Sequence, residues 1–430
     1  MSRERAHLPP AWVGKQAQRC GTLVLRSASR LRLSRSTIGD RHDAWRVAAC
    51  ERAPVSSPTA EQLPRAGVDL DRRPILVFWE STRACLLACR HCRAEAQATP
   101  VPGELTTEES LRFIDSLAAF DRPAPILVIT GGDALMRPDL HELVVHAREA
   151  GVPVALAPSV TPLLTDGRLA ELRELGVKIA SLSLDGASAA THEGMRGVDG
   201  HFEATLDALR RMRSQGFVVQ VNTVVTVENV EELPQIARIV RDAGASIWEV
   251  FFLVNVGRGT SMSELGQAEN EDVCQFLYDA SRYGFIVRTV EGPMFRRVVA
   301  WREQGRVGPV GALYERLSRG LVDQFGSPSS ASKAQTKGTR DGRGIVFVSS
   351  TGDVYPAGFL PIVLGNVKER NIVELYREHP LLREIRAAAF HGKCGRCEYR
   401  ELCGGSRARA FASTGDPLAE DPACAYVPAA

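Results

Sequence analysis

Short apolar runs alternate with longer segments of helical periodicity from residue 73 onward. The runs predict strands at 74–79, 126–130, 154–157, 179–184, 218–226 and 248–253. The segments between them predict helices at 107–119, 138–150, 166–175, 202–215 and 230–243. This alternation is typical of βα units around a parallel sheet. Six units are fewer than the eight of a closed TIM barrel, so we predict an α/β fold, a partial (β/α)6 TIM-type barrel with its site at the carboxyl ends of the strands.

The rest of the chain divides around this barrel core, which we expect at 73–300. Residues 1–72 are rich in Arg, Ser and Pro and have weak periodicity, so we predict a disordered extension there. Residues 301–343 predict a bridging helix and a flexible linker. Residues 344–430 predict a small cysteine-rich domain that begins with a hairpin at 344–355 and contains one helix near 371–389.

The charge and hydropathy of the chain exclude two classes of partner. The net charge is +2, and the first 70 of the 430 residues hold 12 Lys and Arg against 6 Asp and Glu. The remainder has 41 basic against 45 acidic residues, so we expect no basic surface for nucleic acid. No run of about 18 apolar residues occurs, so we expect no membrane span.

Three of the ten cysteines follow the first predicted strand at CxxxCxxC spacing, namely Cys85, Cys89 and Cys92. Three thiolates can hold three corners of a cuboidal 4Fe-4S cluster and leave the fourth iron open to a small chelating molecule. A zinc site is the alternative, but structural zinc takes four ligands and no fourth cysteine lies near. His91 is the remaining candidate for that ligand, although its ring would have to fold back past Cys89 and Cys92.

A second group of cysteines lies near the end of the chain and consists of Cys394, Cys397, Cys403 and Cys424. Four thiols can fully ligate one cluster, and a zinc ribbon is the alternative for this group. Clustered cysteines of this kind are typical of metal sites in a reducing compartment, so we expect a cytoplasmic protein. Cys274 falls in a segment of helical periodicity, where a buried inert thiol is expected.

Segments after the later strands add to the cysteine spacing, and together they resemble the radical SAM superfamily, in which S-adenosylmethionine (SAM) binds the open iron. The family carries a GGEP segment after its second strand, and this chain has Gly131-Gly132-Asp133-Ala134 there. The resemblance implies that Gly131, Gly132 and Asp133 hold the amino group of SAM. It also implies that Ser183 and Arg196 contact the carboxylate and ribose of SAM, and we add His91 to the expected cofactor contacts.

Asn222 is a further candidate for a SAM contact, because it places an amide inside an otherwise apolar strand. Such a position is costly unless the amide is hydrogen-bonded. The bond could go to the ribose or carboxylate of the cofactor. A structural bond at the end of the strand ladder is the alternative.

From about residue 72 to residue 428 the chain resembles the radical SAM proteins with SPASM or twitch extensions, in particular those related to anaerobic haem synthase. The resemblance runs through Trp79-Glu80-Ser81-Thr82-Arg83, Cys92-Arg93-Ala94-Glu95, Gly352-Asp353-Val354-Tyr355-Pro356, Gly365-Asn366-Val367, Gly392-Lys393-Cys394-Gly395-Arg396-Cys397 and Gly404-Gly405-Ser406-Arg407-Ala408-Arg409. Members with two auxiliary clusters usually have cysteines where this chain has Ala357 and Ser406. We therefore expect one auxiliary 4Fe-4S cluster, held by the C-terminal cysteines.

The resemblance implies an enzyme that cleaves SAM reductively and uses a 5'-deoxyadenosyl radical to take hydrogen from its substrate. Anaerobic haem synthase decarboxylates porphyrin propionates, so a tetrapyrrole side chain is one expected substrate, and a ribosomal peptide is the other. Arg288, Arg296 and Arg297 are candidates to grip substrate carboxylates. A ferredoxin or flavodoxin is the expected electron donor. A non-catalytic iron-sulfur or zinc protein is the alternative from another class.

Overall fold

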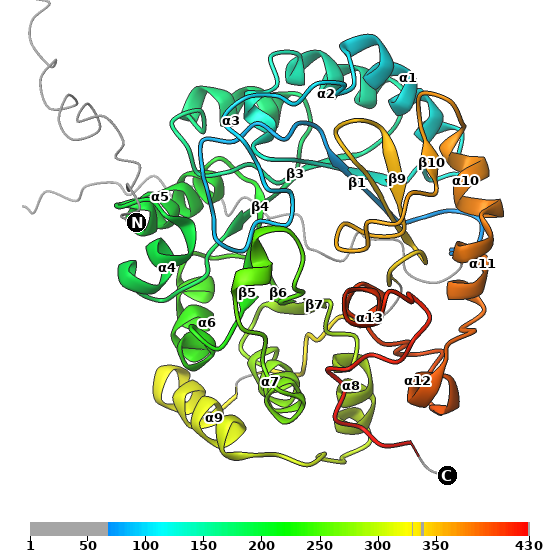
Figure 1. The fold of residues 1–430 in the computed structure, drawn as a ribbon. Helices are drawn as coiled ribbons and strands as arrows, with labels where there is room; N and C mark the ends of the chain where they lie inside the picture. The colour runs from blue at the N-terminus through cyan, green and yellow to red at the C-terminus, as the bar shows by residue number, and fades with distance from the viewer. Residues whose placement is uncertain (1–67, 329, 337–338, 429–430) are drawn as a thin grey trace, which may run out of the picture.

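A computed structural model describes residues 68–328, 330–336 and 339–428 (Figure 1). The predicted extension 1–72 lies outside the described residues except for its last five. Those five pack on the C-terminal part of the chain, where the Tyr376 hydroxyl donates a hydrogen bond to the Leu70 carbonyl at 2.5 Å. No helix among the described residues is long and apolar enough to cross a membrane.

A ten-stranded sheet organises the molecule, in the order β10-β9-β8-β1-β2-β3-β4-β5-β6-β7. Its strands are β1 (Leu76–Glu80), β2 (Ile126–Thr130), β3 (Val154–Leu156), β4 (Ile179–Ser183), β5 (Val218–Val225), β6 (Ile247–Phe252), β7 (Ile286–Val290), β8 (Ile345–Val348), β9 (Asp353–Tyr355) and β10 (Gly365–Asn366). Strands β1 to β7 pair in parallel with their neighbours, as βα units require. The partial α/β barrel predicted from the sequence is therefore confirmed.

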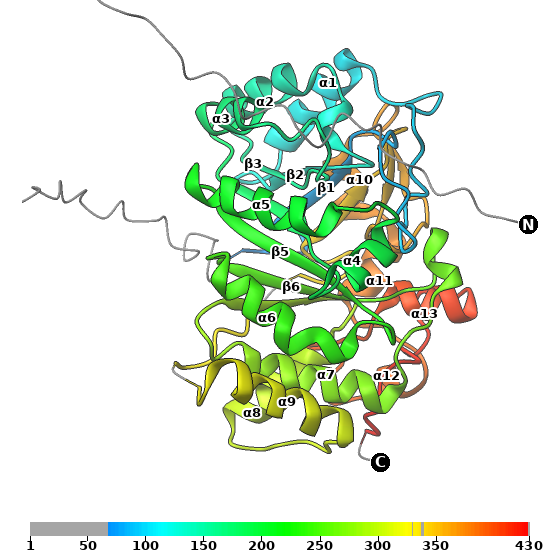
Figure 2. The same ribbon diagram turned by 90° about the vertical axis from the view of Figure 1, so that its left-hand side faces the viewer.

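Helices follow the strands and form an outer ring around the curved sheet (Figures 1 and 2). They are α1 (Thr107–Ala118), α2 (Leu140–Glu149), α3 (Asp166–Glu174), α4 (Ala189–Arg196), α5 (His201–Ser214), α6 (Leu233–Asp242), α7 (Gln267–Ala280), α8 (Phe295–Glu303) and α9 (Ala312–Phe325). The hydroxyl of Thr106 caps α1 by accepting a hydrogen bond from Glu109 N, which satisfies a backbone donor that the helix leaves free.

Strand β7 is a seventh parallel strand that the apolar pattern did not predict. Arg288 and Thr289 interrupt its short apolar run, so the segment lacks the continuous hydrophobicity of a strand covered on both faces. Beyond β7, Lys333 N donates to Ser281 O and Gln335 N donates to Val287 O. Helix α9 lies within 301–343, where a bridging helix and a linker were predicted. Part of the linker therefore runs beside the outer edge of β7.

The C-terminal part continues the same sheet. Strand β8 pairs in parallel with β1, and β8 and β9 form the hairpin that the sequence predicted. The single helix predicted near 371–389 is wrong, because the segment forms α10 (Ile372–Glu378) and α11 (Pro380–Arg386). Pro380 has no N–H to continue α10 but suits the first turn of a new helix. Helices α12 (Gly392–Arg396) and α13 (Arg407–Thr414) follow.

The alternation of side chains on β1 decides which residues face the site. Val77 and Trp79 are fully buried in the main hydrophobic cluster, and Trp79 packs edge-on against Phe113 of α1. Since successive side chains of a strand point to opposite faces, Phe78 and Glu80 point into the barrel. The cluster loop then leaves β1 at its carboxyl end, which is where a parallel barrel places its site.

Candidate active site

The three cysteines after β1 line one cavity at the carboxyl end of the barrel. The cavity measures about 740 Å³ including its open mouth. Cys85 and Cys89 are buried, and Cys92 is half-buried. The residues predicted to contact the cofactor that line the same cavity are His91, Gly131, Gly132, Ser183 and Arg196. Most of the predicted site residues, far apart in the sequence, are thus brought together around the three thiols.

Gly131 and Gly132 hold the cluster loop against the end of β2. Gly132 N donates to Thr82 O and Asp133 N donates to Ala84 O, both at 2.7 Å. A Cβ atom on Gly131 would lie 2.5 Å from Thr82 O, and one on Gly132 would lie 2.3 Å from Ala84 O. Glycine is therefore required here because the backbone of the cluster loop comes so close.

Asp133 does not line the cavity. Its carboxylate is fully buried and accepts hydrogen bonds from Leu135 N, Ser159 N and Thr161 Oγ1 at 3.1, 3.3 and 2.8 Å. Burial raises the pKa of this carboxyl group. The observed role of the Asp133 side chain is to join the turn after β2 to the turn after β3, while the two glycines before it face the cavity.

Asp185, directly after β4, connects several parts of the site. Its carboxylate lies 2.5 Å from Arg196 Nη2 and 3.7 Å from His91 Nε2. Arg196 in turn donates from Nη1 to Cys89 Sγ at 3.5 Å. Burial opposes the ionisation of Asp185, but Arg196, the nearby histidines and the hydrogen bond from Val224 N together outweigh it and lower the pKa of the carboxyl group. Burial also lowers the pKa of His91 to about 4, so this ring is neutral at pH 7.

Two residues that the sequence did not single out also hold the cluster loop. Arg258, after β6, donates from Nε to Cys89 O at 2.9 Å and from Nη1 to Ala96 O at 3.0 Å. Ser159, after β3, lies 3.7 Å from Cys85 Sγ through its hydroxyl and donates to Gly132 O. Arg258 stands between two glycines after a strand, a setting that indicates a close turn but does not reveal its partners.

Asn222 on β5 is not among the residues that line the cavity. Gln220 Nε2 donates to Asn222 Oδ1 at 2.8 Å and to Glu249 Oε2 at 2.9 Å. Burial raises the pKa of Glu249. Asn222 is paired with Ser183, which does line the cavity, in the pairing of β4 with β5. A cofactor contact through Asn222 stays a prediction.

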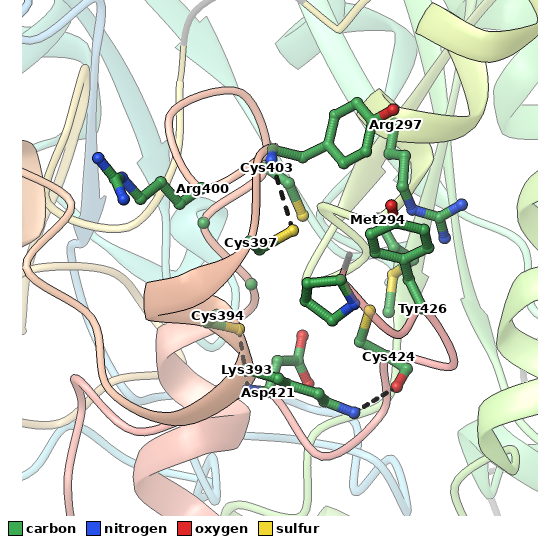
Figure 3. Close-up of a pocket in the computed structure, with 14 residues that line it drawn as sticks. Met294, Arg297, Lys393, Cys394, Cys397, Arg400, Cys403, Asp421, Cys424 and Tyr426 are labelled. Carbon is green, nitrogen blue, oxygen red and sulfur yellow. Dashed lines mark hydrogen bonds between the residues drawn. The ribbon is translucent and has the colours of Figure 1, made fainter. Parts of the chain in front are cut away.

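The four C-terminal cysteines line a second cavity of about 430 Å³ (Figure 3). Backbone groups already point at two of the sulfurs: Asp421 N donates to Cys394 Sγ at 3.3 Å and Tyr399 N to Cys397 Sγ at 3.4 Å. Burial raises the pKa of Cys403 to about 12 and that of Cys424 to about 11. A bound metal would reverse this, because a coordinating thiol is deprotonated.

The donors of the two groups of cysteines fit iron-sulfur clusters, because thiolates are the usual ligands of such clusters. The first cavity is lined by three of these thiols and the second by four. Several buried nitrogens of residues that line the first cavity also lack a hydrogen-bond partner, among them His91 Nδ1, Arg196 Nε and Arg258 Nη2. Such orphaned donors fit a site that receives a polar ligand.

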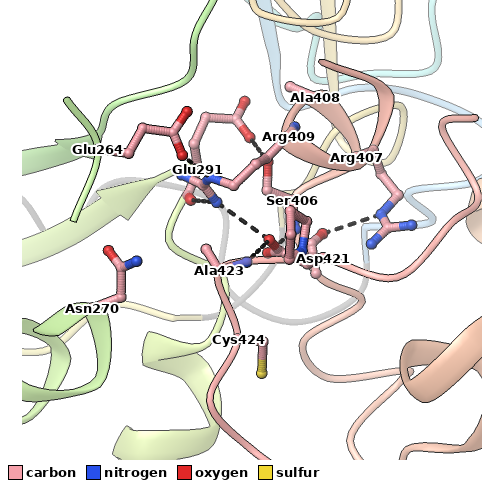
Figure 4. A network of polar contacts seen from close by, with 12 residues as sticks. Glu264, Asn270, Glu291, Ser406, Arg407, Ala408, Arg409, Asp421, Ala423 and Cys424 are labelled. Carbon is pink, nitrogen blue, oxygen red and sulfur yellow. Dashed lines mark hydrogen bonds and ion pairs between the residues drawn. The ribbon is translucent and has the colours of Figure 1, made fainter. Parts of the chain in front are cut away.

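Ser406 and Ala357, which stand where two-cluster relatives have cysteines, belong to the packed interior. Ser406 Oγ accepts a hydrogen bond from Arg409 N at the start of α13 and donates one to Glu291 Oε2 (Figure 4). Ala357 is buried in a small apolar cluster with Val254, Leu360 and Ala408. These positions are filled by a polar network and an apolar cluster, which agrees with a single auxiliary site.

Comparisons with known proteins identify relatives of this chain. The radical SAM superfamily model matches residues 79–240. The AdoMet-dependent heme synthase of Methanosarcina barkeri is 37% identical over 84% of this chain and 99% of its own length. The Fe-coproporphyrin III synthase of the same organism is 30% identical over 82% of this chain and 88% of its own length. The crystal structure of Streptococcus suis SuiB bound to precursor peptide SuiA shares the fold, with a TM-score of 0.58, 14% identity and coverage of 83% and 76% of the two chains.

Proposed function

The chain belongs to the radical SAM superfamily, and from this premise we propose that it decarboxylates a propionate side chain of a tetrapyrrole. The observation that carries the proposal is the similarity to AdoMet-dependent heme synthase, which extends over 99% of that protein's length. The similarity also covers 84% of this chain. The cytoplasm is the proposed location.

Cys85, Cys89 and Cys92 are the residues that would hold the SAM-binding 4Fe-4S cluster, and Cys394, Cys397, Cys403 and Cys424 are those that would hold the auxiliary one. When bound, the first cluster and SAM supply a 5'-deoxyadenosyl radical, for which a ferredoxin or flavodoxin provides the electron. Gly131 and Gly132 fix the cluster loop against β2, and Ser183, Arg196, His91 and Asn222 supply polar groups to orient SAM. Asp185 restrains Arg196 and His91 so that both keep their direction.

Decarboxylation of the propionate releases one electron. The propionate loses a hydrogen atom from the carbon next to the ring, and the bond between its other methylene carbon and the carboxylate then breaks. The products are a vinyl group, CO2 and one electron. A one-electron acceptor is therefore required, and a cluster at the four C-terminal cysteines, which needs no open iron, suits that role.

A peptide substrate is the second candidate. SuiB, whose structure contains a precursor peptide, shares this fold at 14% identity. Such a likeness supports the common scaffold only. Among the relatives of about 30% identity, the Fe-coproporphyrin III synthase is named for a tetrapyrrole, whereas the mycofactocin maturase MftC of Mycobacterium tuberculosis is not. The relative of 37% identity is named as a heme synthase. The tetrapyrrole is therefore the better-supported substrate.

The test is an anaerobic assay of the reconstituted protein with SAM, dithionite and iron coproporphyrin III. We expect 5'-deoxyadenosine, CO2 and a porphyrin that has lost a carboxyl group and one further hydrogen from each propionate that reacts. Cys85→Ala should abolish all three products, and Cys394→Ala should abolish decarboxylation. A porphyrin that stays unchanged while 5'-deoxyadenosine forms would refute the substrate. Two 4Fe-4S clusters correspond to about eight irons per chain. Bound zinc in place of this iron would instead favour the alternative of a non-catalytic metal-binding protein.

A further inference from the structure

One inner wall of the barrel is formed jointly by β1 and the C-terminal hairpin. Phe78 of β1 is paired in register with Phe347 of β8, and Phe347 is paired with Tyr355 of β9. Side chains at paired positions lie on the same face of a sheet, so Phe347 and Tyr355 share the inward face of Phe78. Their rings stack almost in parallel, with centroids 5.9 Å apart and planes at 9°.

Arg93 lies against this wall, directly after the last cysteine of the cluster loop. Its Nη2 atom is 3.1 Å from Glu80 Oε2, and its guanidinium carbon lies 4.3 Å from the centre of the Phe347 ring. Glu80 is 4% exposed, so its carboxylate is held at the end of β1. The guanidinium is thus fixed by a carboxylate at one edge and by an aromatic ring on one face.

The remaining donors of Arg93 are free to bind a ligand. Its side chain is 21% exposed. Apart from the Glu80 contact, no described residue accepts a hydrogen bond or forms an ion pair with its guanidinium. An oriented guanidinium presents several N–H donors in a rigid fork that matches a carboxylate. Its position next to Cys92 means that a carboxylate bound here would lie beside the predicted cluster.

Two further aromatic rings belong to or contact the chain segment beside Arg93. Phe251 of β6 packs against Phe359 from the turn after β9, with ring centroids 6.3 Å apart. Gly358 makes room for the stack, because a Cβ atom there would lie 3.3 Å from both Arg93 Nε and the Phe347 ring. A ligand with a flat apolar body and a carboxylate at its edge matches this combination.

We infer that Arg93 binds a carboxylate of the substrate, and that Glu80 and Phe347 hold its guanidinium in position. The inference rests on the proposed function, because it requires a substrate that carries carboxylates. It assigns the substrate contact to the cluster loop itself and to the wall that β8 contributes. The C-terminal part therefore forms part of the substrate site as well as holding the auxiliary cysteines.

Two of the arginines that the sequence suggested for this role are already engaged elsewhere. Arg297 forms an ion pair with Glu271, and Arg296 donates to the carbonyl groups of Leu402, Cys403 and Thr339. Arg288 donates from Nε to Gln335 at 2.7 Å, and its Nη2 is buried. None of the three combines an orienting carboxylate with accessible free donors as Arg93 does.

The test measures equilibrium binding of iron coproporphyrin III to the reconstituted protein, anaerobically and without SAM, by the change in the porphyrin absorbance. The variants are Arg93→Gln, Arg93→Lys and Glu80→Gln. The matched control is Arg90→Gln, because Arg90 lies in the same loop but pairs with exposed Glu228. Loss of a charge-assisted hydrogen bond predicts that Arg93→Gln weakens binding about 10- to 100-fold. The lysine variant should recover only part of this, and the control should match the wild type.

The tetramethyl ester of the same porphyrin separates the carboxylate contact from general damage. We expect the wild type and Arg93→Gln to bind the ester equally, and both more weakly than the wild type binds the acid. SAM binding by calorimetry should be unchanged in Arg93→Gln, which shows an intact cluster site. Equal binding of the acid by wild type and Arg93→Gln would overturn the role of Arg93 but leave the proposed substrate standing. No binding of the acid by the wild type would overturn the proposed substrate and this inference together.

Discussion

The Asp185 carboxylate lies 2.5 Å from Arg196 Nη2, and both side chains are buried. Arg196 also donates to Cys89 Sγ, and Asp185 accepts a hydrogen bond from Val224 N on β5 at 2.9 Å. The pair therefore connects the end of β4, helix α4, strand β5 and the cluster loop. Its charges compensate each other in a place where an isolated charge would be costly.

Removing one charge of this pair should destabilise the protein. Asp185→Asn leaves Arg196 buried without its counter-charge, and breaking a buried pair in this way costs about 3–5 kcal/mol. We expect a loss of that order in the free energy of unfolding, measured anaerobically by chemical denaturation, together with weaker SAM binding. Asp242→Asn is the control, since Asp242 pairs with Arg238 on the exposed face of α6. That change should cost no more than about 0.5 kcal/mol, and equal losses in both variants would contradict the role given to Asp185.

A methyl group at Gly132 should prevent the cluster loop from docking. The added Cβ would lie 2.3 Å from Ala84 O and 2.7 Å from Arg83 O, both backbone atoms that cannot rotate away. Gly132→Ala should therefore lower the iron content and abolish SAM binding after reconstitution. Gly194→Ala in α4 is the matched control, because a Cβ there would meet nothing within 4 Å. It should stabilise α4 by up to about 1 kcal/mol, and normal iron loading in both variants would disprove the steric argument.

The architecture could be predicted from the sequence because each βα unit carries its own apolar pattern. Strand β7 was missed because Arg288 and Thr289 interrupt its apolar run. The place of β8 in the sheet depends on a distant partner, since β8 joins β1 from more than two hundred residues away in the chain. No local pattern contains that information, because the pairing depends on where the barrel leaves an open edge.

The spacing of Cys85, Cys89 and Cys92 predicted that they form one group, and they line one cavity. The role of Asp133 was not predictable, since its partners Ser159 and Thr161 follow a different strand. No role was assigned to Asp185 from the sequence, because its contact with His91 crosses from one loop to another. Residues that hold other residues in place become visible only when the loops are brought together.

Acidification should destabilise the fold through the paired rings of His192 and His201. Asp185 N donates to His192 Nδ1, so the proton of His192 lies on Nε2, which is 2.8 Å from His201 Nδ1. Burial lowers the pKa of His192 to about 3 and that of His201 to about 4, against 6.5 for the ordinary group. Stability is therefore present above pH 6.5 and is lost as the pH falls toward 4.

Denaturation curves recorded across this range measure the effect. Each histidine should contribute a slope of up to about 1.4 kcal/mol per pH unit. His192→Gln should flatten the decline, whereas His141→Gln should not, because His141 is exposed on α2. An unchanged slope in His192→Gln would show that other groups cause the acid sensitivity.

Glu291 should produce the opposite dependence at higher pH. It follows β7 in a left-handed conformation with φ of 55°, and Ser406 donates to its carboxylate (Figure 4). Burial, helped by the charge of nearby Asp341, raises its pKa from 4.5 to about 8. A raised pKa favours the protonated form in the folded state, so the stabilisation is complete below pH 4.5 and is lost as the pH rises through 8.

The free energy of unfolding of the wild type should therefore fall between pH 5 and 8, by up to about 1.4 kcal/mol per pH unit, relative to Glu291→Gln. Glu303→Gln at the exposed end of α8 serves as the control and should keep the wild-type dependence of the unfolding free energy on pH. If this dependence is the same in the wild type and in Glu291→Gln, Glu291 is already ionised in the folded protein.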